Sequence, residues 1–275
     1  MHQHTIQKSI TLQGIGLHSG QTVHLNLLPA PGNTGIVFVR TDLTARPAIR
    51  AHIANLGAKL RRTCLILDDS EVYTTEHLLS VCYAMNLSNL TIEMDGPEVP
   101  GMDGSAFPFY EAIKAVGLQA QAQNIPVLTL QQPIEVTQDK ATLKAIPADH
   151  LHLEYLLDHD LPNFPAQKVI VDLNEATFAQ ELAPARTFVL KQEVEQLRRM
   201  GMGKGATTHN TLVVDEATGK PIDNVLRFPD EFPRHKMLDL VGDLALLGKR
   251  LNAHLIAYRS GHALNAKLVQ ELAKL

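Results

Sequence analysis

The chain has 275 residues, of which 45% are hydrophobic and 20% charged, a composition typical of globular domains and unlike that of disordered or low-complexity chains. Its net charge of −4 at pH 7 gives no basic excess of the kind that nucleic-acid-binding proteins carry, so we expect no nucleic-acid partner. We expect a cytoplasmic protein without a transmembrane segment, because no apolar run could span a bilayer, no signal-peptide pattern opens the chain, and two cysteines are too few for a disulfide framework.

The first part of the chain predicts β-strands separated by turns. Alternating apolar residues indicate strands at 6–12 and 23–27, on either side of a glycine-punctuated turn at 14–20. The β-branched and aromatic run at 36–39 is typical of a buried strand.

A helix, a strand and a second helix are expected next. The first helix should cover about 75–85, because Thr74 or Thr75 can cap it and Glu76 in its first turn suits the helix dipole. The strand at 90–94 then leads through a turn-rich segment into a helix at about 105–116.

The second half repeats this order of elements. The segment LNLLPA at 25–30 is echoed by LKAIPA at 143–148, and an apolar strand follows each, the second at 151–157. EHLL at 76–79 is echoed by RHKML at 234–238, and each opens a helix. Because several elements match in the same order, the sequence indicates a duplication.

We therefore expect an α+β fold of two duplicated domains, 1–124 and 125–275, with the boundary in the polar stretch 119–124. Each domain should contain a small mixed β-sheet with its helices on one face. The second is expected to end in a strand at 254–258 and a helix from Ala263 onward. The two helical layers should pack together as a β-α-α-β sandwich, with an inserted segment in each half.

The sharpest local signal for chemistry is the pair His235 and Asp239. Residues four apart share one face of a helix, so these two side chains point the same way, as two ligands of one metal would. Asp243 follows four residues later and can orient a ligand by accepting a hydrogen bond. Taken alone, such a pair is more often a solvated helix face with an ion pair.

Glu76 and His77 form the second signal. Adjacent helical residues diverge by about 100°, so His77 can bind a metal while Glu76 reaches past it to a water molecule as general base. With His235 and Asp239 this gives three protein ligands, the open arrangement of a catalytic zinc. His262 follows a tight turn and is placed to donate a proton to a leaving group. Each of these signals is common without function when isolated.

Five segments occur together in an order that resembles one known family. They are TEHLL at 75–79, PEVPGMDGS at 97–105, ARTF at 185–188, DEFPRHKMLD at 230–239 and SGHALN at 260–265. With GIGLH at 14–18, they resemble the UDP-3-O-acyl-N-acetylglucosamine deacetylases, the zinc amidases of lipid A biosynthesis. The resemblance covers nearly the whole chain, and its several long motifs make it specific.

The resemblance implies one zinc ion per chain and a role for individual residues. His77, His235 and Asp239 match the zinc ligands of the family. Glu76 matches its general base, and His262 matches the general acid that protonates the leaving amine.

Further residues match positions around the reacting groups. Thr187 matches the hydroxyl that hydrogen-bonds the oxyanion, and Asp243 matches the carboxylate that supports the general acid. Lys236 matches a residue near the sugar nucleotide. Arg259 stands where the family often has Lys, and either cation can hold a diphosphate.

The segment 188–214 has no counterpart in the first half and is expected to be an insertion. It matches the apolar passage that takes the fatty acyl chain, and Phe188 at its start is expected to contact substrate. The run GKGATTHN at 203–210 departs from the family's pattern, which leaves the preferred acyl length open. His18 is expected to be a structural turn residue, with a place beside the metal cleft as the alternative.

The implied reaction is zinc-dependent hydrolysis of the N-acetyl group of UDP-3-O-acyl-N-acetylglucosamine. It gives UDP-3-O-acyl-glucosamine and acetate and is the committed step of lipid A biosynthesis. The expected partner is a small molecule, an acylated UDP-sugar, and the expected state is a monomer. Two alternatives stay open: a non-catalytic binder of acylated sugar nucleotides, and a zinc amidase acting on another N-acyl sugar.

Overall fold

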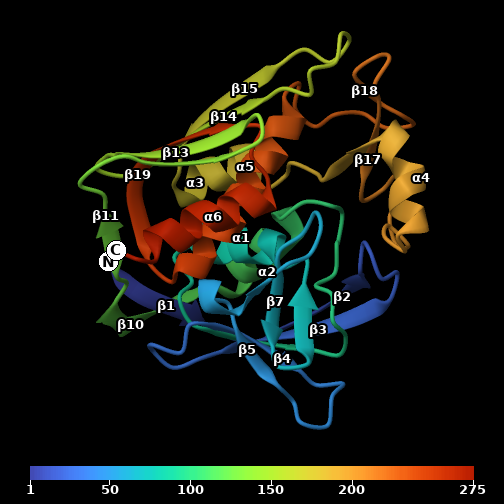
Figure 1. The fold of residues 1–275 in the computed structure, drawn as a ribbon. Coiled ribbons are helices and arrows are strands. Elements are labelled where there is room, and N and C mark those ends of the chain that lie inside the picture. Colours follow the sequence, from blue (N-terminus) through green and yellow to red (C-terminus); the bar gives the residue numbers. More distant parts are fainter.

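Helices lie between two β-sheets in the computed structural model, which describes all residues 1–275 (Figure 1). The first sheet has, in spatial order, β2 (Ile10–Ile15), β3 (Thr22–Pro29), β9 (Leu90–Met94), β4 (Ile36–Arg40) and β5 (Ala48–Arg50). The second has β12 (Ile134–Gln138), β13 (Ala141–Pro147), β19 (Arg250–Tyr258), β14 (Leu151–Leu157) and β15 (Gln167–Asp172), and β11 (Val127–Thr129) pairs with the start of β19.

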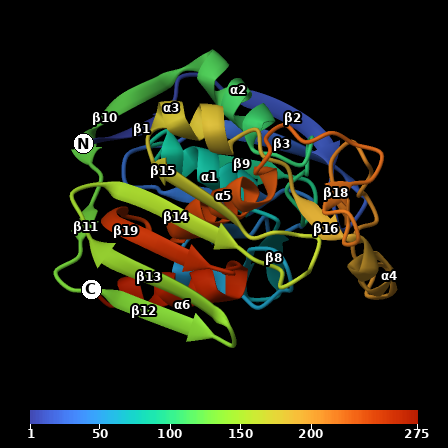
Figure 2. The same ribbon diagram turned by 90° about the horizontal axis from the view of Figure 1, so that it is seen from above.

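The two sheets have the same topology, which confirms the predicted α+β fold and its internal repeat. In each sheet, the strand that comes last along the chain (β9 or β19) lies at the centre, antiparallel to one neighbour (β3 or β13) and parallel to the other (β4 or β14). In β14 and β19 buried and partly exposed residues alternate, so one face of this sheet is covered by helices and the other faces solvent (Figure 2).

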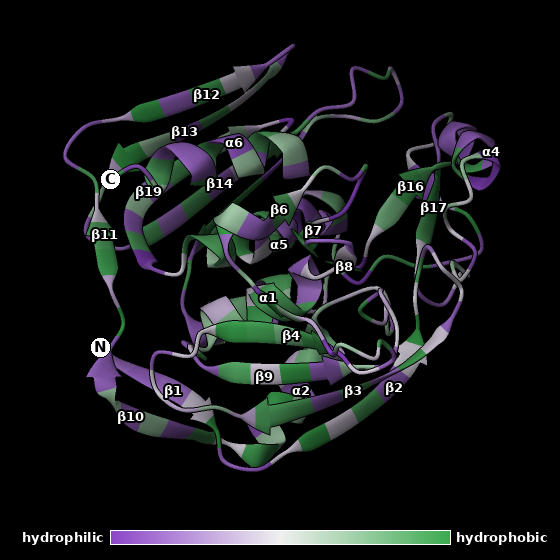
Figure 3. Ribbon diagram, turned by 60° about the horizontal axis from the view of Figure 1, so that its bottom comes forward, coloured by the Kyte–Doolittle hydropathy of each residue, from purple (hydrophilic) through white to green (hydrophobic).

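The central helices are α1 (Glu76–Ala84) and α5 (Glu231–Leu244), and they pack against each other between the sheets (Figure 3). Every residue of α1 is buried, including the polar Glu76, His77 and Ser80, so the helix is enclosed on all sides. The close approach of the two helices requires Gly242, because a Cβ there would lie 2.1 Å from the Glu76 carbonyl oxygen. The outer helices α2 (Phe107–Val116) and α6 (His262–Leu272) begin close to the expected positions.

A single hydrophobic core of 59 buried residues runs through both halves. It joins side chains of both sheets to those of the central helices, so the two repeats share one interior. The division into domains at 124 stays a prediction from the sequence. None of the helices is long and apolar enough to cross a membrane.

One local expectation was wrong. The alternation at 6–12 runs across a break, because the chain forms β1 (His2–Ile6), turns, and then begins β2. The polar stretch at 119–124, for which no strand was expected, is part of β10 (Leu118–Asn124), which pairs antiparallel with β1. Most side chains of β10 face solvent, so its polar composition is that of an exposed two-stranded ribbon.

Each half carries one additional three-stranded sheet. The first contains β6 (Leu56–Gly57), β7 (Cys64–Leu67) and β8 (Ser70–Tyr73), with a 3-10 turn at Ile53–Asn55 before it. The second contains β16 (Phe188–Leu190), β17 (Leu212–Asp215) and β18 (Lys220–Pro221), with α4 (Lys191–Arg199) beside it. This second unit extends past residue 214, the end expected for the insertion. The remaining helical segments are α3 (Glu175–Thr177), a π-helical turn at Phe178–Leu182 and a 3-10 turn at Ala245–Leu247.

Candidate metal centre and active site

The packing of α1 against α5 brings three predicted metal ligands together. The ligand atoms of His77, His235 and Asp239 all lie within 4.8 Å of one another, and all three residues are buried. Asp239 Oδ1 is 3.5 Å from His235 Nε2 and 3.8 Å from His77 Nε2. The two imidazole rings meet edge to face, with centroids 5.0 Å apart.

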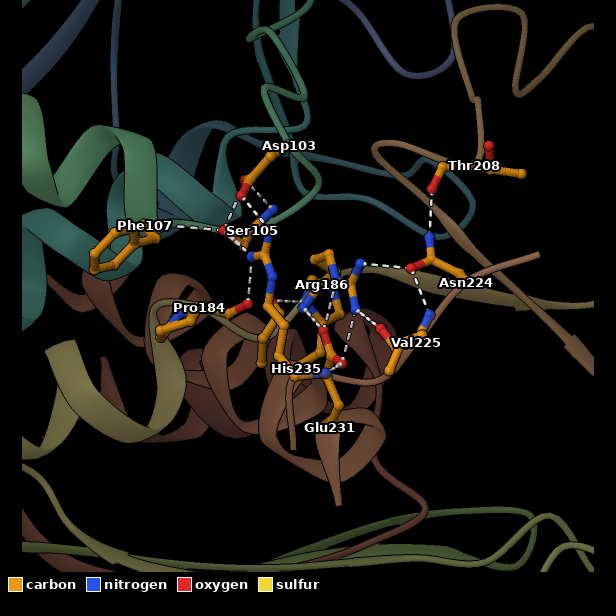
Figure 4. Close-up of polar contacts among 12 residues, drawn as sticks. Asp103, Ser105, Phe107, Pro184, Arg186, Thr208, Asn224, Val225, Glu231 and His235 are labelled. Atoms are coloured by element: carbon orange, nitrogen blue, oxygen red, sulfur yellow. Dashed lines mark hydrogen bonds and ion pairs between the residues drawn. The ribbon is translucent and has the colours of Figure 1, made fainter. Parts of the chain in front are cut away.

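The orientation of His235 is set by a backbone contact. Its Nδ1 lies 3.0 Å from the Ala185 carbonyl oxygen, so Nδ1–H donates there and Nε2 keeps its lone pair toward Asp239. Next to Ala185, the buried Arg186 holds Glu231 on α5 through Nε, 2.8 Å, and through its backbone N–H, 3.0 Å (Figure 4). This ion pair ties the segment that carries the carbonyl to the helix that carries the histidine.

The donor set fits a divalent metal. Burial lowers the pKa of His77 to about 3 and also lowers the pKa of His235, so both rings are neutral at pH 7. Burial raises the pKa of Asp239, but the opposing effect of Lys236 and the surrounding histidines is larger and brings this pKa below its usual range. Separations of 3.5 and 3.8 Å exceed those of hydrogen bonds and are close to the roughly 3.3 Å between atoms that ligate one tetrahedral zinc.

Glu76 and His262 face each other beside these three residues. Glu76 Oε1 is 3.8 Å from His262 Nε2, and Oε2 accepts a hydrogen bond from the Thr63 backbone N–H at 3.1 Å. Burial raises the pKa of Glu76 to about 7. Burial lowers the pKa of His262, but the carboxylates of Asp243, Asp239 and Glu76 outweigh it and raise that pKa to about 9.

A polar network supports His262 from behind. His262 Nδ1 is 3.0 Å from Asp243 Oδ2, which also accepts from Asn265 Nδ2 at 2.8 Å. The Thr63 hydroxyl donates to the other oxygen of Asp243, and the Ser260 hydroxyl donates to Asn265 Oδ1 at 2.6 Å. Neither Thr63 nor Asn265 was expected from the sequence to have a role. Asn265 had a local signal, three residues after His262 on the same helix, whereas Thr63 is 180 residues from Asp243.

These groups line a cavity of about 1380 Å³, which also takes in the other predicted site residues. Thr187 and Phe188 are part of its wall, as are Lys236 and Arg259. Lys236 Nζ contacts Asp239 Oδ2 at 2.5 Å, and Arg259 pairs with Asp158 at 2.9 Å. Five further cations of the lining were not singled out from the sequence: Lys59, Arg61, Arg62, Lys140 and Arg198.

The inserted segment contributes an apolar part of the same cavity. Its lining side chains are Phe188, Val189, Leu190, Val194, Leu197, Met202 and Val213. Within the run 203–210 that departs from the family's pattern, Gly203 and 206–208 also reach the wall.

His18 is a turn residue and also lines the cavity. The two places expected for it, in the turn and beside the metal cleft, therefore coincide. Burial and then Arg62 lower the pKa of its ring to about 4. The turn is held by the fully buried Glu98, which accepts from the backbone N–H groups of His18 at 2.9 Å and Ser19 at 2.7 Å. Glu98 also accepts from the hydroxyl of Thr74, whose φ of +59° turns the chain into α1.

Comparison with known proteins gives a consistent result over the whole chain. A family model described as UDP-3-O-acyl N-acetylglycosamine deacetylase matches residues 3–274. A protein of Myxococcus xanthus named UDP-3-O-acyl-N-acetylglucosamine deacetylase is 41% identical over 98% of this chain and 86% of its own length. Proteins with the same name from a Nostoc species (42% identical, 100% of this chain and 99% of its own) and from Saccharophagus degradans (40%, 99% and 90%) match similarly.

Proposed function

The chain belongs to the UDP-3-O-acyl N-acetylglycosamine deacetylase family, and from this membership we propose that it hydrolyses the N-acetyl group of UDP-3-O-acyl-N-acetylglucosamine. The products are UDP-3-O-acyl-glucosamine and acetate, and the reaction is the committed step of lipid A biosynthesis. The main structural support for this proposal is that five residues lie together in the wall of one cavity: His77, His235, Asp239, Glu76 and His262.

We propose that His77, His235 and Asp239 bind one zinc ion per chain. Two neutral imidazoles and one carboxylate leave a coordination position open, which is the pattern of catalytic rather than structural zinc. A zinc ion bound there supplies Lewis-acid polarisation of the acetamide carbonyl and favours deprotonation of water.

The remaining residues divide the proton transfers between them. Glu76 takes a proton from the attacking water, whose oxygen forms the new bond to the acetamide carbon. The Thr187 hydroxyl donates a hydrogen bond to the oxygen that gains negative charge. His262 gives its proton to the departing nitrogen as the C–N bond breaks, and Asp243 fixes the orientation of the His262 ring through Nδ1.

Polar and apolar parts of the cavity suit different parts of the substrate. Lys236 and Arg259 supply cations for the nucleotide diphosphate, with Arg259 kept in place by its pair with Asp158. The apolar side chains of the inserted segment, beginning with Phe188, are suited to the fatty acyl chain. We further propose a cytoplasmic monomer.

The test measures acetate release from UDP-3-O-acyl-N-acetylglucosamine by purified protein, before and after chelation and after zinc is restored. Loss of activity with the metal and its return with zinc are expected, and full turnover by metal-free protein would contradict the proposal. Substrate binding without acetate release would favour a non-catalytic binder. Faster turnover of a different N-acyl sugar would favour the other alternative.

A further inference from the structure

A second group of histidines lies on the outer face of the C-terminal sheet, remote from the cavity. His152 on β14 is directly opposite His254 on the parallel neighbour β19 and opposite Asp172 on the antiparallel neighbour β15. Figure 2 looks onto this sheet and shows the three strands side by side. His150 precedes β14 by one residue and is two residues from His152, so it lies on the same face.

Two of these rings converge on a single carboxylate. Asp172 Oδ1 is 2.5 Å from His152 Nδ1 and 2.9 Å from His150 Nε2. The His150 and His152 rings meet edge to face, with centroids 6.5 Å apart. The ligand atoms of the three residues all lie within 4.8 Å of one another. Two neighbouring strands, β14 and β15, thus place two imidazoles and a carboxylate at one point on a rigid surface.

The cluster is open to solvent on one side and supported on the other. The side chains of His150 and Asp172 are 65% and 61% exposed, whereas that of His152 is only 28% exposed. The ring of His254 packs edge-on against His152 with centroids 4.5 Å apart, and its own Nε2 is buried without a hydrogen-bond partner. His254 therefore limits the rotation of His152 and leaves the opposite side of the cluster accessible.

The charges suit a cation. Asp172 brings a carboxylate to the cluster, with one oxygen in contact with both rings and the side chain open to solvent. Further along these strands, Lys168 is paired with Glu154 at 2.7 Å and so brings no unpaired positive charge to the cluster.

We propose that His150, His152 and Asp172 form a second metal site, on the outer face of the sheet, for a divalent cation of the imidazole-binding class such as Zn²⁺, Ni²⁺ or Cu²⁺. Imidazole with a carboxylate selects these ions over Mg²⁺ and Ca²⁺, which prefer oxygen ligands. The cation takes the place of the protons between the two ring nitrogens and Asp172, so each ring would carry its proton on its other nitrogen or lose it to solvent. The nitrogen-to-oxygen separations must also open from 2.5 and 2.9 Å toward the roughly 3.3 Å of atoms that share one tetrahedral ion. The exposed His150 and Asp172 can make this adjustment.

The test counts metal ions on protein that already carries one equivalent of zinc. Zn²⁺ is titrated into the wild-type chain and into His152→Ala, and bound metal is measured by calorimetry and by mass spectrometry after dialysis. The wild type should bind one equivalent more than His152→Ala. His209→Ala, which removes an exposed histidine outside the cluster, should bind as the wild type does.

A second readout identifies the ligands directly. With Cu²⁺ as probe, the electron paramagnetic resonance spectrum of the wild type should show coupling to imidazole nitrogens at the additional site, and His150→Ala should lose part of that coupling. Acetate release should be unchanged in His150→Ala and His152→Ala, since neither residue lies in the cavity. Equal metal content in the wild type and His152→Ala would overturn the proposal, whatever the outcome for the active site.

Discussion

The carbonyl oxygen of Glu76 lies against the Cα of Gly242, so closely that a Cβ at 242 would come within 2.1 Å of it and 2.8 Å of its carbon. The contact is between two helix backbones, so no side-chain movement can relieve it. The position of Glu76 in the site therefore depends on the absence of a side chain on the other helix.

Gly242→Ala should separate α1 from α5 and lower both stability and activity. Overpacking of a rigid core contact typically costs about 1–3 kcal/mol, and a displaced Glu76 should lower kcat. Chemical denaturation and acetate release are the measurements. Gly261→Ala is the matched control for stability, because its backbone is extended and nothing lies within 4 Å of the added Cβ. Equal unfolding midpoints of the two variants would contradict this account.

Arg186→Met should be strongly destabilising. It leaves the fully buried Glu231 without its cation, and breaking a buried pair typically costs about 3–5 kcal/mol. Arg46→Met breaks an exposed pair with Glu93 and should cost only about 0–1 kcal/mol. Urea unfolding of the two variants gives the comparison, and equal midpoints would show that the Arg186 network is not a stability element.

Glu98→Gln should loosen the turn of His18 and the start of α1 together. An amide nitrogen cannot accept the hydrogen bonds that both carboxylate oxygens now accept, and an unsatisfied buried group costs about 1–3 kcal/mol. Faster hydrogen exchange at the backbone amides of His18 and Ser19, with lower acetate release, is the expected result. Glu111→Gln, on an exposed position of α2, should leave both unchanged.

Asp103 should make stability depend on pH. Burial raises its pKa, but hydrogen bonds from Ser105 and Arg227 outweigh this and lower the pKa below its usual value. A carboxyl with a depressed pKa in the folded state adds stability above the unfolded pKa of about 3.9 and loses it as pH falls through the folded value.

Asp103→Asn should therefore cost about 1–2 kcal/mol at pH 7, and the difference from wild type should shrink below about pH 4. Denaturant midpoints across this range provide the measurement. Asp69→Asn, at an exposed turn, should show no such gap. A difference that stays constant down to pH 3 would rule out the carboxylate as its source.

His235→Ala should abolish binding of the first zinc ion as well as acetate release. Only two protein ligands remain in this variant, and the Ala185 carbonyl loses the hydrogen bond that it accepts from the His235 ring. Metal content by mass spectrometry, with His209→Ala as control, separates loss of the ion from loss of catalysis. A variant with wild-type zinc content would show that His235 is not a ligand.

Local patterns in the sequence predicted the parts of the site that lie on single helices. The spacing of His235 and Asp239 places them on one face of α5, and the echo between 76–79 and 234–238 predicted that two helix starts are equivalent. The repeat of strand order followed from the same echo, because both halves bury similar apolar runs in the same sequence of elements.

The supporting residues could not be predicted, because their partners are distant along the chain. Thr63 contacts Asp243 across 180 residues, and Glu98 contacts His18 across 80. No periodicity encodes such pairs, since they form only when the two halves pack. The strand at 118–124 was missed for a related reason: exposed ribbons and linkers share a polar composition.

The internal repeat also shows how the two halves come to contribute different residues to the candidate metal centre. His77 and His235 belong to the segments 76–79 and 234–238 that echo each other in the two halves, and their rings meet across the packed helices. Two identical halves would place the same residue before each histidine. Here one copy has Glu76, which faces the cavity, and the other has Arg234, which turns away to Asp230 and Glu181. Divergence of the copies thus makes the two sides of this junction chemically different: the N-terminal half places the Glu76 carboxylate against the cavity, and the C-terminal half places the His262 ring there.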